Sequence, residues 1–591
     1  MKIPAALLPI LVLAAAPLAS AQYSENPALN LAVADLANEE AQPLIVANLD
    51  GGAYVSWFSS DPAGTPAFGY DVRLQRLSAA GEELWGHGGV LIADRGFSST
   101  QDYSLDVDSA GNALLAFRDD RSGSTQITAT KVDAAGVQVW GSNGVQVTST
   151  SAFLAAPVIA WTGDGAVMVA WTQNSNIGMQ RLSKSGLPTW GAGLTLAPGS
   201  GSYSVADMHA SDAGSSILSF VFSSGGFGSP RHLYAQKIDR TGSLLWGASP
   251  VQVFDGGSLQ FGAFPNFVTD GAGGAVFSWY SSSPSLEVFA QRVLSNGTEA
   301  FPHNGVSAST NSSQIRVAPA VAFDAAEQET FVLYEELNAG QSMSGLSAQK
   351  FDATGTRAWG STGLNLRPLG GTTKGGAAAV ATASGVQFFW TESSGFAQSI
   401  LNGQNMDDAG SVLNGPTELS TVPANKFRVS AVQSISGVGL VTWQDDSSGS
   451  DDIMVQNYLP NGGLGGAASS SSRNGSGINP VVYTAISEPA IGALWQTSVD
   501  KSGALGNTGS ALYVYGAPSS GLFLPQGEVL VDLFSPSQLI HFANSAPMTD
   551  TRALPIPPVA ALLGVQLATQ VLILHPTGLV LTNAIDLNLG L

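Results

Sequence analysis

The sequence predicts an all-β protein: one large β-propeller of eight or nine four-stranded blades, followed by a small β-sandwich. Three observations predict it. An aromatic residue recurs every 49 to 60 residues, short apolar strands lie between Gly-, Asp- and Ser-rich turns, and no segment has the 3.6-residue period of a long helix. A four-stranded unit cannot bury both of its faces alone, whereas a ring of such units can. A linear β-solenoid is the alternative, although its repeats are usually shorter.

The N-terminus is typical of a secretory signal, which we expect to span residues 1–21. Lys2 supplies a positive charge, residues 3–17 are apolar, and Ala19, Ser20 and Ala21 form a small-residue cleavage site. A membrane anchor is the alternative, but the apolar run is short and contains three prolines. We therefore expect a secreted or cell-surface protein without a membrane span.

The repeat is defined by two landmarks. The first is an aromatic residue on the second strand of each unit, after a Gly- or Asp-containing turn: Trp57, Phe117, Trp171, Phe220, Trp279, Tyr334, Trp390, Trp443 and Trp495. The second is an aromatic ten residues after a Gln on the third strand, at Trp85, Trp190, Trp246, Phe301 and Trp359, with Trp140 in the same place in the second unit. Units seven and eight keep Gln404 and Gln456 but have Asn414 and Gly466 at the aromatic position.

The ends of the repeat region suggest how the ring closes. Residues 30–35 resemble the fourth strand of a unit, and the last unit, residues 479–515, contains only three strands. An N-terminal strand that completed the last blade would leave no open sheet edge. This predicts a propeller over residues 22–516, with about nine repeats.

The remaining residues, 517–591, predict a small β-sandwich. Apolar strands are expected at residues 528–534, 538–542, 563–574 and 579–589. The last two are expected to form a hairpin around Pro576, Thr577 and Gly578.

Two resemblances accompany these patterns. Residues 117–123 (FRDDRSG), 234–247 (YAQK…WG) and 140–144 (WGSNG) resemble a family of bacterial secreted β-propeller-like repeats. That resemblance covers residues 43–516 and implies an extracellular role without implying catalysis. The segments LPIP, GVQLATQVLILHP and GLVLTNAIDLNLG resemble a C-terminal module of secreted proteins from environmental bacteria, which implies surface association or sorting.

Composition excludes several classes of function. The chain has 44 acidic and 23 basic residues, a net charge of −21, and no cysteine. Nucleic-acid binding requires clustered Lys and Arg, so we expect no nucleic-acid partner. The absence of cysteine excludes disulfides, thiolate zinc sites and a cysteine nucleophile. No P-loop, HExxH or G-x-S-x-G motif is present, and the six histidines do not have metal-ligand spacing.

Acidic residues are the remaining candidates for chemistry. Asp445, Asp446, Asp451 and Asp452 place four carboxylates within eight residues, a pattern that fits a Ca²⁺ loop or, as the alternative, a solvated turn. No other cofactor is expected. Glu335, Glu336 and Glu392 follow second-strand aromatics and are candidates for a glycosidase pair on a propeller face.

We therefore expect a secreted, non-catalytic, monomeric propeller that binds an extracellular glycan or protein through loops on a rigid scaffold. The loops between second and third strands differ most among units, as in PAGTPAFGY, NSN and GGFGSPRH. The alternatives are a glycoside hydrolase or lyase that uses acidic residues, and a structural component of the cell envelope or matrix.

Overall fold

The computed structural model describes residues 22–61, 69–96, 103–226, 228–396, 398–502, 510–535, 539–543, 549–559, 562–575 and 578–591. The expected signal sequence lies outside these residues. The described chain consists of β-strands, turns and one short 3-10 segment, η1 (Asp212–Gly214), which confirms the all-β class. Within these ranges, no helix has the length and apolar character needed to cross a membrane.

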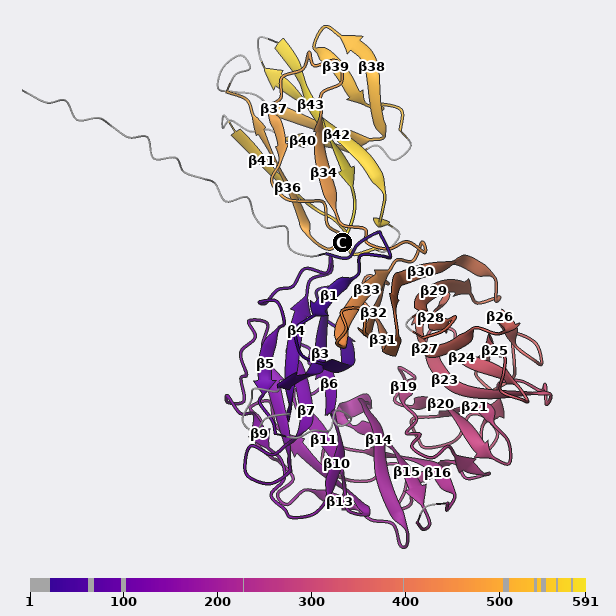
Figure 1. The fold of residues 1–591 in the computed structure, drawn as a ribbon. Helices are drawn as coiled ribbons and strands as arrows, with labels where there is room; N and C mark the ends of the chain where they lie inside the picture. The colour runs from indigo at the N-terminus through magenta and orange to yellow at the C-terminus, as the bar shows by residue number, and fades with distance from the viewer. Residues whose placement is uncertain are drawn as a thin grey trace, which may run out of the picture.

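Eight antiparallel sheets, here called blades 1 to 8, follow one another around a ring (Figure 1). Their strands, in chain order, are as follows. Blade 1 has β2 (Glu40–Ala47), β3 (Ala53–Asp61), β4 (Gly69–Leu77) and β5 (Val90–Ala93), and blade 2 has β6 (Tyr103–Val107), β7 (Ala113–Asp119), β8 (Gln126–Val132) and β9 (Val145–Gln146). Blade 3 has β10 (Leu154–Trp161), β11 (Val167–Gln173), β12 (Asn176–Leu182) and β13 (Leu194–Leu196), and blade 4 has β14 (Ser202–Ala210), β15 (Ser216–Ser223), β16 (Arg231–Ile238) and β17 (Val251–Phe254).

The second half of the ring continues the pattern. Blade 5 has β18 (Ser258–Leu259), β19 (Phe267–Thr269), β20 (Ala275–Ser283), β21 (Glu287–Val293) and β22 (Val306–Ser307), and blade 6 has β23 (Gln314–Asp324), β24 (Glu329–Asn338), β25 (Ser344–Phe351) and β26 (Leu364–Gly370). Blade 7 has β27 (Thr373–Thr382), β28 (Gly385–Ser393), β29 (Ser399–Asp407) and β30 (Val412–Ala424), and blade 8 has β31 (Lys426–Gln433), β32 (Gly439–Asp445), β33 (Asp452–Tyr458) and β1 (Leu31–Ala34). The first strands lie innermost, each beside the first strand of the next blade, and β31 of blade 8 contacts β2 of blade 1.

The ring closes through the N-terminus. Strand β1 pairs antiparallel with β33 and forms the outer edge of blade 8, whereas the sequence predicted that this strand would complete a last unit at residues 479–515. Blade 8 is therefore complete without a later strand. Trp495, which the repeat count assigned to a ninth unit, lies on β36 (Leu494–Asp500) outside the ring. The sequence around Trp495 matches the repeat, but the strand that carries Trp495 does not pair with strands of the ring.

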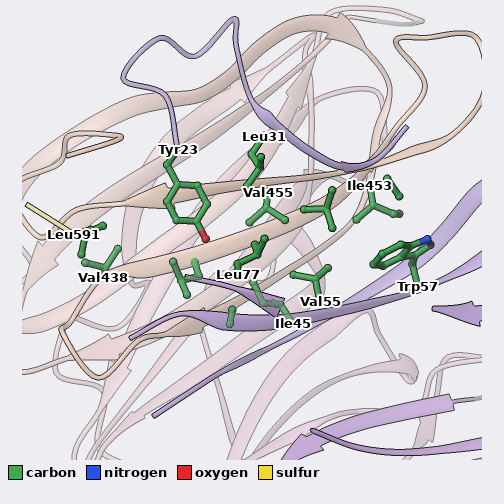
Figure 2. Packing of buried hydrophobic residues seen from close by; sticks show 14 of the residues in the cluster. Tyr23, Leu31, Ile45, Val55, Trp57, Leu77, Val438, Ile453, Val455 and Leu591 are labelled. Atoms are coloured by element: carbon green, nitrogen blue, oxygen red, sulfur yellow. The ribbon is translucent and has the colours of Figure 1, made fainter. Parts of the chain in front are cut away.

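The repeat aromatics of the second strands form the core between blades. All eight on the ring are buried: Trp57, Phe117, Trp171, Phe220, Trp279, Tyr334, Trp390 and Trp443. At the junction of blades 8 and 1, Trp57 belongs to one apolar cluster with Ile453 and Val455 (Figure 2). Burial of such large side chains between adjacent sheets contributes about 2 to 3 kcal/mol for each residue.

The second landmark joins each blade to the next. In blade 4, the Gln236 side chain donates from Nε2 to the Gly247 carbonyl at 2.9 Å and accepts from the Trp246 backbone N–H at 3.1 Å, which explains the spacing of ten residues. The Trp246 indole then donates to the Ser295 carbonyl of blade 5 at 3.0 Å. Trp85, Trp140, Trp190 and Trp359 make the same bond to the following blade at 3.0–3.1 Å.

Blade 8 obtains this landmark from the N-terminus. Gln456 donates from Nε2 to the Ser24 carbonyl at 3.0 Å, and the Tyr23 ring lies so close to Gly81 of blade 1 that a Cβ there would be 2.8 Å away. Tyr23 and Ser24 thus occupy the place of the Trp-Gly pair of other units. Gly466, which has the aromatic position by sequence spacing, does not occupy that place. Ser24 and Glu25 also lie directly against Gly465, where a Cβ would be 2.9 Å from the Glu25 backbone nitrogen.

The C-terminal residues form separate sheets. A five-stranded sheet contains β34 (Ser469–Arg473), β43 (Gly578–Asn588), β42 (Gln566–His575), β37 (Ser510–Gly516) and β40 (Leu539–Ala543) in that order. A three-stranded sheet contains β35 (Tyr483–Ala485), β36 and β41 (Thr549–Pro555), and β38 (Pro518–Leu524) pairs with β39 (Gly527–Val531).

The two larger C-terminal sheets share one apolar cluster that includes Tyr483 and Trp495 from the smaller sheet and Tyr513 and Val571 from the larger one. The change in strand pairing falls between β33 and β34, near residue 466, not at 516. The expected hairpin joins β42 to β43, while Pro576 and Thr577 lie outside the described residues.

Candidate functional site

The propeller has two faces of different composition. Because the strands of each blade alternate in direction, the loops from second to third strands and the connections between blades lie on one face, here called the loop face. The turns from first to second and from third to fourth strands lie on the opposite turn face. Most of the PAGTPAFGY loop lies outside the described residues.

Exposed aromatic side chains gather on the loop face. Among the described propeller residues, five phenylalanines are strongly exposed, and each lies in a loop-face connection or at the adjoining end of a first strand: Phe153, Phe261, Phe264, Phe396 and Phe427. The exposed apolar residues of the described turn face are aliphatic, such as Leu187 and Ile435. Sequence reasoning missed these phenylalanines, because a Phe in a loop carries no periodic signal.

The first strands enclose a central cavity of about 640 Å³. Its lining is mainly apolar, with Phe264, Phe267 and Val429 among the residues, and Asp207 and His209 supply charge. His209 Nε2 lies 3.0 Å from Asp207 Oδ2. Burial opposes the charge on His209, but the carboxylates of Asp207 and Asp106 outweigh it and raise its pKa to about 9. The imidazole is therefore protonated at neutral pH.

A second hollow of about 440 Å³ opens where β2, β27 and β31 reach the loop face. Glu39, Gln42, Phe427, Arg428 and Gln444 line it. Planar polar side chains therefore stand next to an exposed aromatic ring, an arrangement that suits a ligand with hydroxyl groups and an apolar face.

The structure does not bring the four predicted calcium ligands together. Asp445 lies 3.4 Å from the Lys426 ammonium and accepts from the Trp443 indole, while Asp446 accepts from Asn425. Asp451 accepts from the Gln444 amide, and Asp452 is buried. The described residues contain no group of three or more Asp, Glu or His that can hold a metal. Two of these partners, Lys426 and Asn425, lie some 20 residues earlier in the chain, which the local acidic pattern does not reveal.

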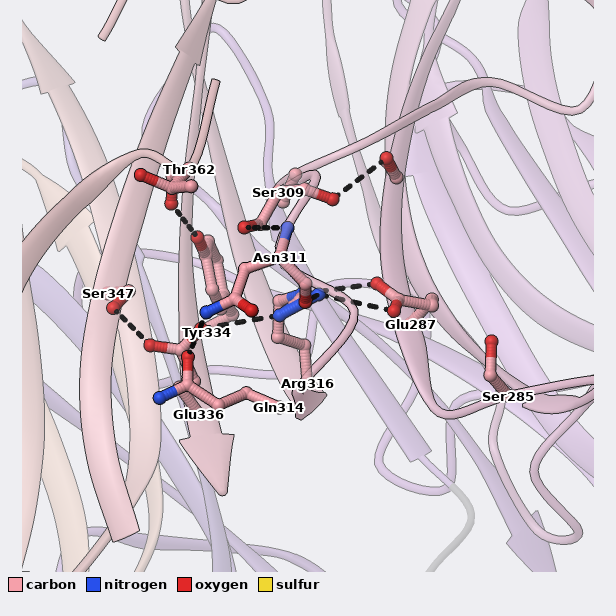
Figure 3. A network of polar contacts seen from close by, with 12 residues as sticks. Ser285, Glu287, Ser309, Asn311, Gln314, Arg316, Tyr334, Glu336, Ser347 and Thr362 are labelled. Carbon is pink, nitrogen blue, oxygen red and sulfur yellow. Dashed lines mark hydrogen bonds and ion pairs between the residues drawn. The ribbon is translucent and has the colours of Figure 1, made fainter. Parts of the chain in front are cut away.

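The candidate glycosidase residues belong to ion networks between blades. Arg316, fully buried on β23, lies 3.3 Å from Glu336 and 3.1 Å from Glu287 of blade 5 (Figure 3). Glu336 also accepts from Ser347, and Glu335 accepts from Ser344 while burial raises its pKa. These contacts assign the two glutamates to blade packing.

Glu392 lines a hollow of about 830 Å³ beside blade 7, together with Glu25, Arg367 and Glu418. It accepts from Thr372 at 2.9 Å and lies 3.5 Å from the Lys374 ammonium. Arg367 of blade 6 lies 3.8 Å away, so the charge of Glu392 is compensated by cations of two blades, and Glu335 and Glu336 do not line this hollow.

Two histidines link consecutive blades. His87 of blade 1 contacts Glu83 at 2.9 Å and Asp35, which follows β1 of blade 8, at 2.6 Å. His303 contacts Glu299 and Asp255 in the same way between blades 5 and 4. Burial opposes the charge on His87, yet both carboxylates raise its pKa. At both turn positions the histidine thus pairs with carboxylates of two consecutive blades.

No family model and no curated protein sequence matches the chain. Among solved structures, the Dos1 propeller is 11% identical, with coverage of 73% of this chain and 95% of that one and a TM-score of 0.39. Puromycin hydrolase is 14% identical with a TM-score of 0.35, over 70% of this chain and 59% of that one. An exo-β-1,3-galactanase from Phanerochaete chrysosporium is 11% identical with a TM-score of 0.26, over 83% and 97% of the two chains. We base no functional argument on these similarities.

Proposed function

We propose that this chain is an exported, non-catalytic β-propeller that binds an extracellular glycan through its loop face. The observation that carries the proposal is the placement of all five strongly exposed phenylalanines of the described propeller on that face. Exposed aromatic rings on one side of a soluble protein are typical of interaction sites.

The chemistry of the face favours a carbohydrate over a protein partner. The phenylalanines are spread over several blades, whereas protein interfaces concentrate their apolar residues in one buried centre. Phe427 stands beside Gln42, Gln444 and Arg428 in the 440 Å³ hollow, so a sugar ring can stack on the phenyl group while amides and a guanidinium bind its hydroxyls. The central cavity and this hollow offer room for more than one sugar.

The enzymatic alternative has no specific support. Glycoside hydrolysis requires two carboxyl groups, one able to give a proton and one free to act as base or nucleophile. Glu336 and Glu392 each lie against a cation, and Glu335 is bound to a serine. The other alternative, a structural role in the envelope, predicts that no ligand binds to the loop face. The glycan array described next tests that alternative as well.

The test is a glycan array followed by calorimetry on the glycans retained. We expect binding without product release, and Phe427→Ala to weaken it about twofold to tenfold, since an aromatic contact of this kind contributes about 0.5 to 1.5 kcal/mol. Leu187→Ala, which removes an exposed apolar side chain from the turn face, is the matched control and should bind like wild type. The proposal is overturned if the array retains no glycan. It is also overturned if Phe427→Ala and Phe264→Ala both bind glycan as tightly as wild type.

A further inference from the structure

Arg231 stands out among the basic residues of this acidic protein. It begins β16 of blade 4, and its guanidinium carbon lies 5.5 Å from the ring centre of Phe261 and 5.3 Å from that of Phe264. Both rings come from the segment between β18 and β19 of blade 5. The side chain thus bridges two blades on the loop-face side of the ring.

The Arg231 guanidinium has no acidic partner among the described residues. Most other basic side chains of the propeller form ion pairs there, as Arg292 does with Asp270 and Arg181 with Asp164. Arg231 Nε and Nη2 are enclosed and make no hydrogen bond, whereas Nη1 is not enclosed. The phenyl rings therefore cover two of the three nitrogens and leave one donor group open.

The two phenyl rings hold the Arg231 guanidinium without neutralising its positive charge. Burial lowers the pKa of Arg231, but an arginine remains protonated at physiological pH. The faces of the two phenyl rings stabilise the cation electrostatically without supplying a hydrogen-bond acceptor. In a chain of net charge −21, acidic side chains are abundant, so a guanidinium left without one is available to an external anion.

The surroundings indicate what kind of anion fits. Phe261 and Phe264 are 64% and 44% exposed, so their rings can stack on a ligand while they hold the arginine. Phe264 also lines the 640 Å³ central cavity. A ligand that enters the cavity over Phe264 passes within reach of the Arg231 guanidinium. The overall negative charge disfavours a dense polyanion, which leaves a ligand with isolated acidic groups.

We propose that Arg231, Phe261 and Phe264 form a subsite for an acidic sugar, whose carboxylate or sulfate accepts from Arg231 Nη1 while its ring stacks on the phenyl groups. This inference rests on the proposed glycan binding and specifies the class of sugar. The two sources of the anion, a uronic acid and a sulfated sugar, share this chemistry and are separated by the choice of probe.

The experiment compares matched ligands by calorimetry on the full mature chain. The probes are an oligosaccharide with a single galacturonic acid residue, the same oligosaccharide as its methyl ester, and a galactose oligosaccharide that carries one sulfate, with its desulfated form. We expect the charged member of one pair to bind about tenfold to a hundredfold more tightly than its neutral match, as a charge-assisted hydrogen bond implies. That preference should weaken with added salt.

Substitutions test whether the preference for charged over neutral probes arises at Arg231. Arg231→Gln should abolish the difference between charged and neutral probes, while Arg231→Lys should retain part of it. Arg240→Gln removes a more exposed positive charge from the turn face of the same blade and should leave binding of every probe unchanged. Melting temperatures close to that of wild type confirm that each variant folds, and a variant that does not fold is replaced by Phe264→Ala, which should weaken both members of a pair.

The possible failures are distinguishable. If neutral glycans bind and Arg231→Gln binds every probe as wild type does, the acidic subsite is overturned while the proposed function stands. If no probe and no glycan on the array binds, both are overturned.

Discussion

Basic side chains in the described propeller are mostly paired with carboxylates within the fold. Arg316, Lys374 and Lys426 occupy corresponding places on the first strands of blades 6, 7 and 8, each opposite a carboxylate on the second strand. Such buried pairs fix how neighbouring strands pack more than they add stability. Arg231 and the exposed phenylalanines depart from this rule, which is why they mark the candidate site.

His209 provides a pH-dependent test at the same scale. Its folded pKa, about 9, lies above the ordinary value of 6.5, so the stability it contributes is fully present below about pH 6.5 and is lost as the pH rises through 9. We expect the difference in melting temperature between wild type and His209→Gln to be largest near pH 6 and to close by about pH 9.5. His232→Gln, a histidine without an ion pair among the described residues, is the control. A difference that grows with pH would contradict the assignment.

Sequence reasoning at this scale succeeded where a residue type recurs. The Gln and aromatic landmarks were readable because five units repeat the same ten-residue spacing, although the bond from each indole to the following blade was not. The calcium loop stays a prediction, and the contacts of Asp445 and Asp446 with Lys426 and Asn425 could not be read from the local acidic pattern. Exposure of a loop phenylalanine depends on the packing of its neighbours and leaves no periodic trace.

At the scale of strands, the first strand of most blades carries a bulge. Register shifts occur in β2, β10, β14, β23, β27 and β31, and a residue with positive φ lies at five of them: Gln42, Ala156, Ala318, Gly376 and Arg428. In blade 5 the corresponding stretch lengthens into the segment between β18 and β19 that carries Phe261 and Phe264. An extra residue bends a strand and redirects its side chains, here around the central cavity.

Ala318, with a φ of 49°, tests whether these bulges store strain. Glycine adopts this conformation without a Cβ penalty, so Ala318→Gly should raise the free energy of unfolding by about 0.5 to 1 kcal/mol. Ala320→Gly, two residues along the same strand and outside the positive-φ region, should lower it by a similar amount. Denaturant unfolding of the two variants measures both changes, and a loss of stability in Ala318→Gly would contradict the strain.

Strands themselves were predictable, whereas their partners were not. The pattern around Trp495 resembles a second strand of the repeat, yet β36 pairs with β41, more than 50 residues later in the chain. Alternation of apolar and polar residues specifies which face of a strand is buried, and it does not specify the neighbouring strand. The boundary between propeller and C-terminal sheets was misplaced for this reason.

For the whole molecule, the N-terminal segment completes the ring. β1 supplies the outer strand of blade 8, Tyr23 and Ser24 supply its missing landmark, and His87 binds Asp35 across the junction. The sequence showed that a strand near residues 30–35 would close the ring. It did not show the role of Tyr23, because a single aromatic outside the repeat spacing has no counterpart to align with.

Tyr23 is therefore expected to matter for stability through its ring alone. It is buried, and its hydroxyl has no hydrogen-bond partner among the described residues. Tyr23→Ala should lower the free energy of unfolding by about 3 kcal/mol, as for other buried aromatics, whereas Tyr23→Phe should leave it unchanged or slightly raise it. Thermal unfolding of the mature chain measures both, and equal stability of the three proteins would show that the segment does not hold blade 8.

The contact of Gly465 with Ser24 and Glu25 means that the end of blade 8 and the N-terminal segment of the described residues meet at one point of the ring. In a chain without the C-terminal sheets, a short linker there, with new ends opened in a turn between two other blades, would give a circular permutant in which the contacts between blades are retained. The starting blade is thus a matter of gene order, and the closed ring has no preferred beginning.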